Sequence, residues 1–307
     1  MIPDIGCSWE RYLTLLVSAH GGWTALTHTL IRRAGPDAGL PVDPGSIERA
    51  LRRLRTKGNA PGGQYGVWLI RHFGLPTPLE ETARWMGQYH SRFSDLPVSL
   101  RETQLWLWDR PPISESPASA WIHLGLASVA LRRNDFEAAR ARLAAISSPS
   151  PLARIEADLL AGRLTFGVER AAILADVGKQ VSSLAPSEDR DCYYARWADQ
   201  HAYHLIHTEN LLPEAKTVYE SIPADTPALF AQFRRHHGLA YCHWKLDDTK
   251  TAVHHATLAI QHAGDAGLLR FRVMALQLLA HITPTNAPTL HQRANQIATT
   301  LEHADLT

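Results

Sequence analysis

The sequence predicts an all-α protein, an α-solenoid of antiparallel helix pairs with a basic helical domain at its N-terminus. Helix starts expected at Ala120, Arg154, Tyr193, Leu229 and Leu268 follow one another at steps of 34, 39, 36 and 39 residues, which is close to the period of stacked helix pairs. Residues 1–75 hold nine Lys and Arg against five Asp and Glu, a net charge of +4, whereas residues 76–307 hold 22 against 25, a net charge of −3. We therefore predict two domains, residues 1–75 and 76–307.

The N-terminal domain begins with two stretches of helical periodicity, "SWERYLTLLVSAH" and "WTALTHTLIRRAG". A third helix starts at Pro44, where the missing N–H would be unpaired in any case, and Asp43 is placed to cap it. Its apolar side chains recur at helical spacing and predict a buried stripe: Ile47, Ala50, Leu51 and Leu54. Five cations lie within nine positions of the same helix: Arg49, Arg52, Arg53, Arg55 and Lys57.

A Gly-rich segment and an apolar run follow this helix, in "GNAPGGQYGVWLIRHFG". The run from 65 to 72 predicts a strand, and with it a small β-hairpin wing near residues 60–72. A further helix is the alternative for this segment.

Three helices, a Gly-rich turn and a strand form the order of elements in residues 8–74, and this order resembles a winged helix-turn-helix domain. The resemblance implies that the third helix enters the major groove of DNA. It would direct Ser46, Arg49, Arg52, Arg53 and Thr56 toward DNA, with Arg55 and Lys57 beside them and Arg71 near the backbone. The "AGPDAGLPV" connection before that helix is longer than the tight turn of the simplest such proteins.

Residues 122–151 contain a helix, an "NDF" turn and a second helix that ends before Pro151. This unit resembles a tetratricopeptide repeat, in which small residues at the eighth and twentieth positions allow close helix approach. Those positions fall on Ala127 and Ala139, while His123 replaces the family's usual Trp or Tyr.

Two further stretches match the same template, one through Ala202, Ile206, Ala215, Tyr219, Ile222 and Pro223, the other through Leu239, Ala240, Ala252, Ala256 and Ala259. Residues 152–186, 267–304 and 78–109 are weaker copies. The resemblance implies a surface that binds a peptide or a protein. We expect Trp106, Trp108 and Trp121 to lie in the core between repeats.

Histidines cluster at His201, His204 and His207 and in the pairs at 236–237 and 254–255. No carboxylate or thiolate accompanies them at the spacing of a zinc motif, so we predict no metal and no cofactor. Paired histidines could instead tune binding with pH. The three cysteines lack C-x-x-C spacing and are expected to be reduced and buried.

The predicted function is that of a DNA-binding transcriptional regulator whose helical repeats bind a peptide or protein. The alternative is an interaction adaptor without DNA binding, in which the basic helix is solvated surface or docks on an acidic protein. Neither a phosphate loop nor a nucleophile elbow occurs, so we predict no enzyme. A cytoplasmic protein without a membrane segment is expected. Helix-turn-helix proteins usually read paired half-sites, which would suit a homodimer.

Overall fold

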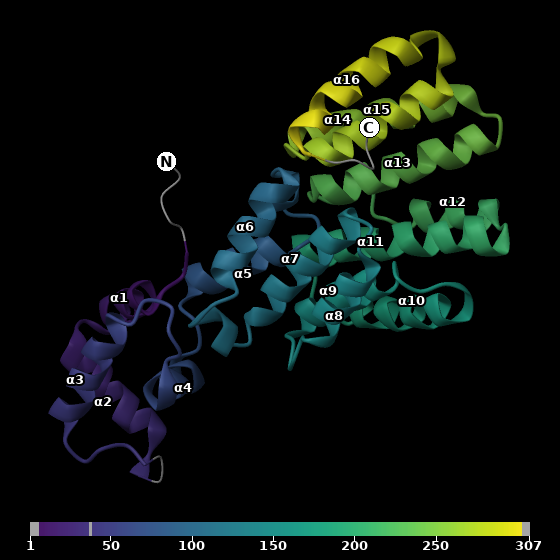
Figure 1. The fold of residues 1–307 in the computed structure, drawn as a ribbon. Helices are drawn as coiled ribbons and strands as arrows, with labels where there is room; N and C mark the ends of the chain where they lie inside the picture. Colours follow the sequence, from purple (N-terminus) through teal and green to yellow (C-terminus); the bar gives the residue numbers. More distant parts are fainter. Residues whose placement is uncertain (1–5, 37–38, 303–307) are drawn as a thin grey trace. The chain divides into compact units, whose positions relative to one another are not determined.

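The computed structural model describes residues 6–36 and 39–302, which contain sixteen α-helices and no strand (Figure 1). The all-α prediction is therefore confirmed. The first six helices are α1 (Trp9–His20), α2 (Trp23–Ala34), α3 (Pro44–Arg55), α4 (Gly63–Phe73), α5 (Thr77–Gly87) and α6 (Val98–Trp108). The others are α7 (Ser119–Arg132), α8 (Phe136–Ala144), α9 (Pro151–Ala161), α10 (Gly167–Ser182), α11 (Glu188–His204), α12 (Leu212–Glu220), α13 (Leu229–Lys245), α14 (Thr249–Asp265), α15 (Leu269–Ile282) and α16 (Ala287–Thr300).

The chain divides into two compact units. Unit 1 comprises residues 1–87, 102–126 and 145–150, and unit 2 comprises residues 88–101, 127–144 and 151–307. Helices α6 and α7 contribute residues to both units. The predicted domain boundary at residue 75 stays a prediction.

Unit 1 is built on α1, α2 and α3, each of which contacts the other two. The predicted stripe of α3 is buried in this core, with Ile47 and Leu51 fully covered. The start of α3 is as predicted, since the Asp43 carboxylate accepts hydrogen bonds from the backbone N–H groups of Gly45 and Ser46. These bonds satisfy donors that have no partner within the helix.

The predicted strand at 65–72, and with it the hairpin wing near 60–72, is wrong, because this segment is the helix α4. Backbone packing explains the difference. A Cβ atom at Gly62 or Gly66 would lie within 3 Å of the Trp9 indole, so both glycines allow α4 to start directly against α1. Trp68 and Leu69 are buried on the same helix, whereas Val67 is 45% exposed. The apolar run is thus half of an amphipathic helix.

One of the three tryptophans expected in the core is on the surface. Trp108 and Trp121 are 1% and 4% exposed, but Trp106 is 45% exposed. Positions 106 and 108 are two residues apart, about 200° around a helix, so one helix cannot bury both against the same neighbour.

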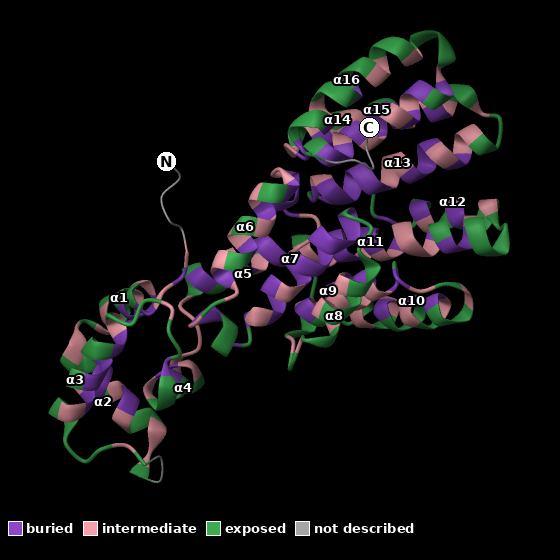
Figure 2. Cartoon of the chain, viewed as in Figure 1, coloured by how far each residue is buried: buried purple, intermediate pink, exposed green. Residues whose placement is uncertain are grey.

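Unit 2 contains four complete helix pairs in succession, α9–α10, α11–α12, α13–α14 and α15–α16. Each helix packs on the next, and the first helices of successive pairs also contact one another. Figure 2 shows the buried residues concentrated on the sides of these helices that face neighbours. This arrangement is compatible with a helical repeat, because each pair covers the apolar stripe of the one before it.

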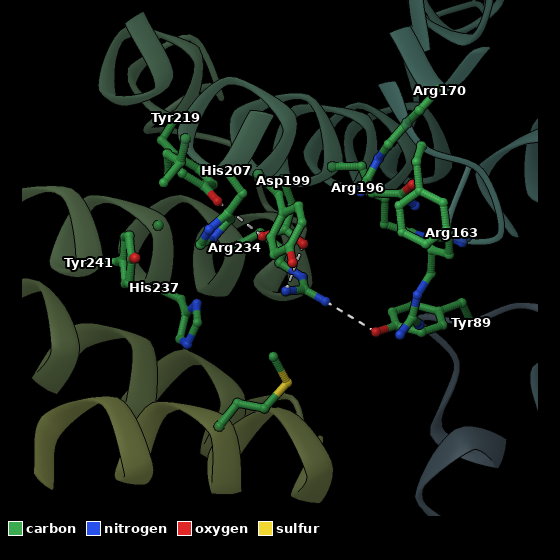
Figure 3. Close-up of a pocket in the computed structure, with 16 residues that line it drawn as sticks. Tyr89, Arg163, Arg170, Arg196, Asp199, His207, Tyr219, Arg234, His237 and Tyr241 are labelled. Carbon is green, nitrogen blue, oxygen red and sulfur yellow. Dashed lines mark hydrogen bonds and ion pairs between the residues drawn. The ribbon is translucent and has the colours of Figure 1, made fainter. Parts of the chain in front are cut away.

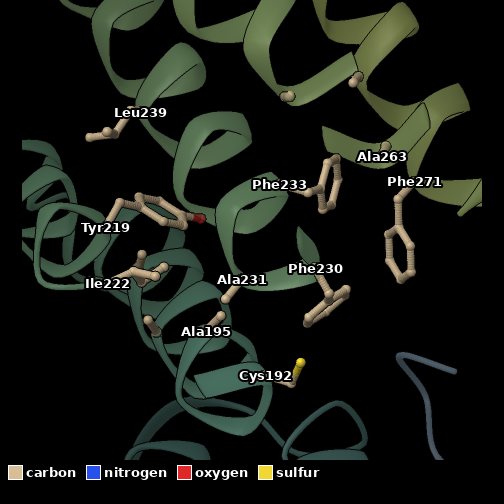
Figure 4. Packing of buried hydrophobic residues seen from close by; sticks show 14 of the residues in the cluster. Cys192, Ala195, Tyr219, Ile222, Phe230, Ala231, Phe233, Leu239, Ala263 and Phe271 are labelled. Atoms are coloured by element: carbon tan, nitrogen blue, oxygen red, sulfur yellow. The ribbon is translucent and has the colours of Figure 1, made fainter. Parts of the chain in front are cut away.

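Small side chains make the close packing possible. Ala252, Ala256, Ala259 and Ala263 form a fully buried row on α14. Large rings fill the space between α13 and α15, where Phe230, Phe233 and Phe271 pack on one another in the same core as Ala195 and Ala231 (Figure 4). The positions predicted to be small, Ala127, Ala139, Ala202 and Ala215, are likewise fully buried.

All three cysteines are free and buried, Cys7 in unit 1 and Cys192 and Cys242 in unit 2. None of the helices in the described part of the chain is both long enough and apolar enough to span a membrane.

Candidate functional site

The first candidate surface is the solvent side of α3 in unit 1. Arg49, Arg52, Arg53 and Lys57 are exposed, and Arg55 is half-buried. They lie away from the buried stripe, so the helix presents apolar residues to the core and cations to water. Four of the predicted cations thus lie on the side of α3 away from the core, and Lys57 follows just after the helix ends.

Several of these cations already have partners within unit 1. Arg49 pairs with Asp43 at 3.4 Å, Arg52 pairs with Glu48 at 2.8 Å and stacks over Trp23, and Arg55 pairs with Glu10 at 3.3 Å. Arg53 and Lys57 make no ion pair with any described residue. Exposed ion pairs contribute only about 0–1 kcal/mol and weaken with salt, so an incoming polyanion can replace them.

Two other predicted residues have different roles. Ser46 is half-buried, and its hydroxyl donates to Asp43 at 2.6 Å and accepts from Arg49 at 2.9 Å. Arg71 is exposed, but it lies on α4 and not on a wing. The connection before α3 includes Asp37 and Ala38, which lie outside the described residues.

The second candidate surface is a pocket in unit 2 with a cavity volume of about 520 Å³. This volume lies within the range of about 300–1,000 Å³ that small-molecule sites occupy. Its sixteen lining residues come from the segment before α6, from the turn between α9 and α10, and from α10, α11, α12, α13, α15 and the π-helical turn Leu205–Glu209 (Figure 3).

Two helices contribute most of the lining, and they do so with the same spacing. Helix α11 provides Arg196, Asp199, Gln200 and Tyr203, and α13 provides Arg234, His237, Gly238 and Tyr241. Both sets follow the pattern i, i+3, i+4, i+7, which places four side chains on one helical face. The first helices of two successive pairs therefore point matching polar faces into the pocket.

Asp199 organises one wall of the pocket. Its carboxylate forms an ion pair with Arg234 at 3.0 Å and accepts a hydrogen bond from the Tyr219 hydroxyl at 3.2 Å. Burial, followed by the Asp199 charge, raises the pKa of Tyr219, so this phenol stays protonated and donates. Gly238 makes room for the Tyr219 ring, because a Cβ there would lie 2.1 Å from Cε1 of the ring.

A second wall carries guanidinium groups without carboxylate partners. Arg170 is only 9% exposed, stacks over the Tyr203 ring at 4.9 Å, and leaves its Nε atom without a hydrogen-bond partner. Arg163 is exposed and reaches toward the Tyr89 ring at 5.9 Å. Neither forms an ion pair with a described residue, whereas Arg196 pairs with the fully buried Glu156.

Tyr89 lies where these cations converge. Its hydroxyl accepts a hydrogen bond from Arg234 at 3.3 Å, and the guanidinium groups of Arg270 and Arg196 stack on its ring at 4.1 and 4.7 Å. Burial alone would raise the pKa of this phenol. Four nearby guanidinium groups outweigh burial and lower the pKa to about 7; they belong to Arg270, Arg234, Arg163 and Arg132. The field in this part of the pocket is thus strongly positive.

His237 adds no charge to the pocket at neutral pH, since burial and then the neighbouring Arg234 lower its pKa to about 4. A separate group of histidines lies between α13 and α14. His236 stacks on His255 and on His262, with ring centroids 5.1 and 5.3 Å apart. Among the described residues, no three His, Cys, Asp or Glu side chains are placed to hold a metal ion.

The sequence did not identify the residues of this pocket. A usable signal was present, since α11 and α13 both carry Arg at the first position of an i, i+3, i+4, i+7 face and Tyr at the last. Comparison with protein-family models, curated proteins and solved structures gives no match to this chain. The function therefore has to be argued from the two surfaces themselves.

Proposed function

We propose that the protein is a DNA-binding transcriptional regulator in which α3 contacts DNA and the helical array of unit 2 binds a peptide or protein partner. One observation carries the DNA half: the four arginines of α3 lie away from the stripe that anchors this helix in a core, and Lys57 follows just after its C-terminal end. Arginine suits this role because its planar fork can bind phosphate or guanine through two hydrogen bonds.

The order of helices in unit 1 supports the resemblance to helix-turn-helix domains only in part. Three helices pack on one another and the third carries the basic face, as in that class. The wing is replaced by α4, so we expect α3 and Lys57 to make the main DNA contact, with Arg71 reaching DNA from α4. The resemblance of unit 2 to tetratricopeptide repeats supports a surface that binds a partner. We place this surface at the pocket that α11 and α13 line.

The test is an electrophoretic mobility shift with genomic DNA fragments, comparing wild type with the triple variant Arg49→Ala, Arg52→Ala and Arg53→Ala. The matched control replaces three exposed cations of unit 2, Lys179, Lys250 and Arg293, with alanine, which changes the net charge equally. We expect the α3 variant to lose the shift and the control to keep it. Equal shifts for all three proteins would refute the assignment of the basic face.

One observation favours the alternative of an adaptor without DNA binding: three of the four arginines on α3 already pair with acids of the same unit. In that case the basic helix docks on an acidic protein. The ratio of absorbance at 260 and 280 nm, measured on protein purified at low salt and again after a high-salt wash, separates the two. A constant, protein-like ratio together with one stoichiometric protein partner that survives nuclease would favour the adaptor.

A further inference from the structure

Six arginines in the described part of unit 2 are buried: Arg101, Arg132, Arg170, Arg196, Arg234 and Arg270. Only two carboxylates are buried with them, Asp95 and Glu156, and Asp199 is the further acid in contact with one of these arginines. Removing a guanidinium group from water costs several kcal/mol unless an anion or good hydrogen bonds compensate. This part of the fold therefore holds more positive charge than its own acids neutralise.

Part of this excess positive charge lies at the wall of the pocket. Four arginines and one aspartate line the cavity, and Glu156 pairs with Arg196, which leaves a net charge of +2 at the wall while Tyr89 is protonated. The two arginines without a carboxylate partner are Arg163 and Arg170. Buried nitrogen atoms of Arg170 and Arg234 also lack hydrogen-bond partners. These are unused donors beside a cavity large enough for a ligand.

Aromatic and apolar side chains complete the lining. Phe166 and Tyr203 are 80% and 50% exposed, and Ile206, Tyr241 and Met274 lie around the same cavity. Exposed rings next to guanidinium groups suit a ligand with a flat or apolar body and a charged end.

We propose that the pocket of unit 2 binds a phosphate monoester carried by an aromatic body, with Arg163 and Arg170 holding the phosphate and Tyr203 and Phe166 covering the ring. This inference rests on the proposed role of unit 2 as a receptor and names the chemistry of its ligand. A phosphate monoester carries a charge of about −1.5 to −2 at pH 7 and three acceptor oxygens, so it matches the net charge of the wall better than one carboxylate does.

Two sources could supply this group, a mononucleotide or a phosphorylated tyrosine side chain of a peptide. Isothermal calorimetry on the full chain distinguishes them with two matched pairs of probes. The first is adenosine monophosphate against adenosine, and the second is N-acetyl-phosphotyrosine amide against N-acetyl-tyrosine amide. We expect the phosphorylated member of one pair to bind roughly 100-fold more tightly than its partner, because only that member offers charged acceptor oxygens to the two arginines.

Variants test the assigned residues. Arg163→Gln changes an exposed side chain and should leave the fold intact, so it keeps the test valid even if Arg170→Gln does not fold. We expect either variant to weaken binding of the phosphorylated probe about tenfold, the effect of about 1.4 kcal/mol. Arg293→Gln, on the exposed side of α16, is the control and should bind like wild type.

Tyr89 provides a second readout. Its pKa of about 7 predicts a tyrosinate absorbance change near 295 nm around neutral pH, which Tyr89→Phe should abolish. Bound phosphate would neutralise part of the surrounding charge and move the midpoint of this transition upward. The charged groups that act on Tyr89 are Arg132 of α7, Glu156 of α9, Arg163, Arg196 of α11, Arg234 of α13 and Arg270 of α15.

Three results would overturn the inference: affinities within threefold for both members of each pair, no binding by any of the four probes, or Arg163→Gln binding like wild type. Each leaves the DNA assay of α3 unaffected, and binding of unphosphorylated peptides would still support a receptor. Loss of the DNA shift, in turn, would not alter the calorimetry. The two proposals can therefore fail separately.

Discussion

Gly238 shows how one residue sets the packing of the pocket wall. It lies on α13 where the Tyr219 ring of α12 crosses, and the ring occupies the space that a side chain would need. The hydroxyl group of Tyr219 donates a hydrogen bond to Asp199, so the glycine positions a hydrogen bond as well as a contact.

We predict that Gly238→Ala lowers the free energy of unfolding by about 1–3 kcal/mol, because the added methyl group forces the Tyr219 ring to move. Urea denaturation followed by circular dichroism measures this. Gly264→Ala on α14 is the control, since its nearest neighbour would be the flexible end of Arg272 at 3.8 Å. Alanine in a helix is favoured over glycine by about 0.5–1 kcal/mol, so the control should be neutral or stabilising. Equal effects at both positions would contradict the close approach at Gly238.

At the scale of elements, α13 and α14 are joined by a cluster of stacked imidazoles. His236 and His255 approach with their Nδ1 atoms 2.9 Å apart. Burial, followed by the neighbouring histidines, lowers the pKa of both to about 4. Other charged or titratable groups face this cluster: Arg235, His243, Asp248, His254, His262 and Asp265.

We predict that the stability of unit 2 falls as the pH drops from about 6.5 toward 4. Between these pH values the histidines bind protons in the unfolded chain but stay neutral in the folded cluster, so a falling pH favours unfolding. Above pH 6.5 the histidines are neutral in both states, and the free energy of unfolding does not depend on them. The loss should be clearly less than the sum of the two shifts at about 1.4 kcal/mol per pKa unit, because the two titrations are coupled and solvent screens both half-buried rings. Thermal unfolding between pH 7 and 4 measures it.

The double variant His236→Asn and His255→Asn should flatten this pH dependence, whereas His281→Asn, at an exposed position of α15, should not. A slope that survives in the double variant would place its origin outside the cluster.

Much of this arrangement of helices could be predicted, because small residues at facing positions and helical spacing are local properties of the sequence. Ala252 and Ala256 are buried as predicted. The segment 65–72 was misassigned because Val67, Trp68, Leu69 and Ile70 form an unbroken apolar run, and only the contact of Gly62 and Gly66 with Trp9 shows that a helix is needed there. The matching faces of α11 and α13 are visible in the sequence, but the complete pocket could not be predicted, since Tyr89, Arg170 and Arg234 come from distant parts of the chain.

At the scale of the whole molecule, the basic domain and the near-neutral remainder predict binding that is electrostatic in origin. If four cations of α3 contact DNA phosphates, the logarithm of the affinity should fall with the logarithm of the salt concentration with a slope of about −3.6. The affinity would then drop roughly 150-fold between 50 and 200 mM salt. Fluorescence anisotropy with a labelled duplex measures this slope, and a salt-independent affinity would exclude phosphate contacts as its source.

The three buried cysteines can serve as chemical probes of unfolding. Burial, the largest influence on each, raises the pKa of the Cys7, Cys192 and Cys242 thiols to about 12, so the reactive thiolate is scarce while the fold is intact. Alkylation should therefore report only molecules in which the surrounding helices have separated. Because Cys7 belongs to one unit and the other two belong to the second, the order in which they are modified would reveal which half of the chain comes apart first.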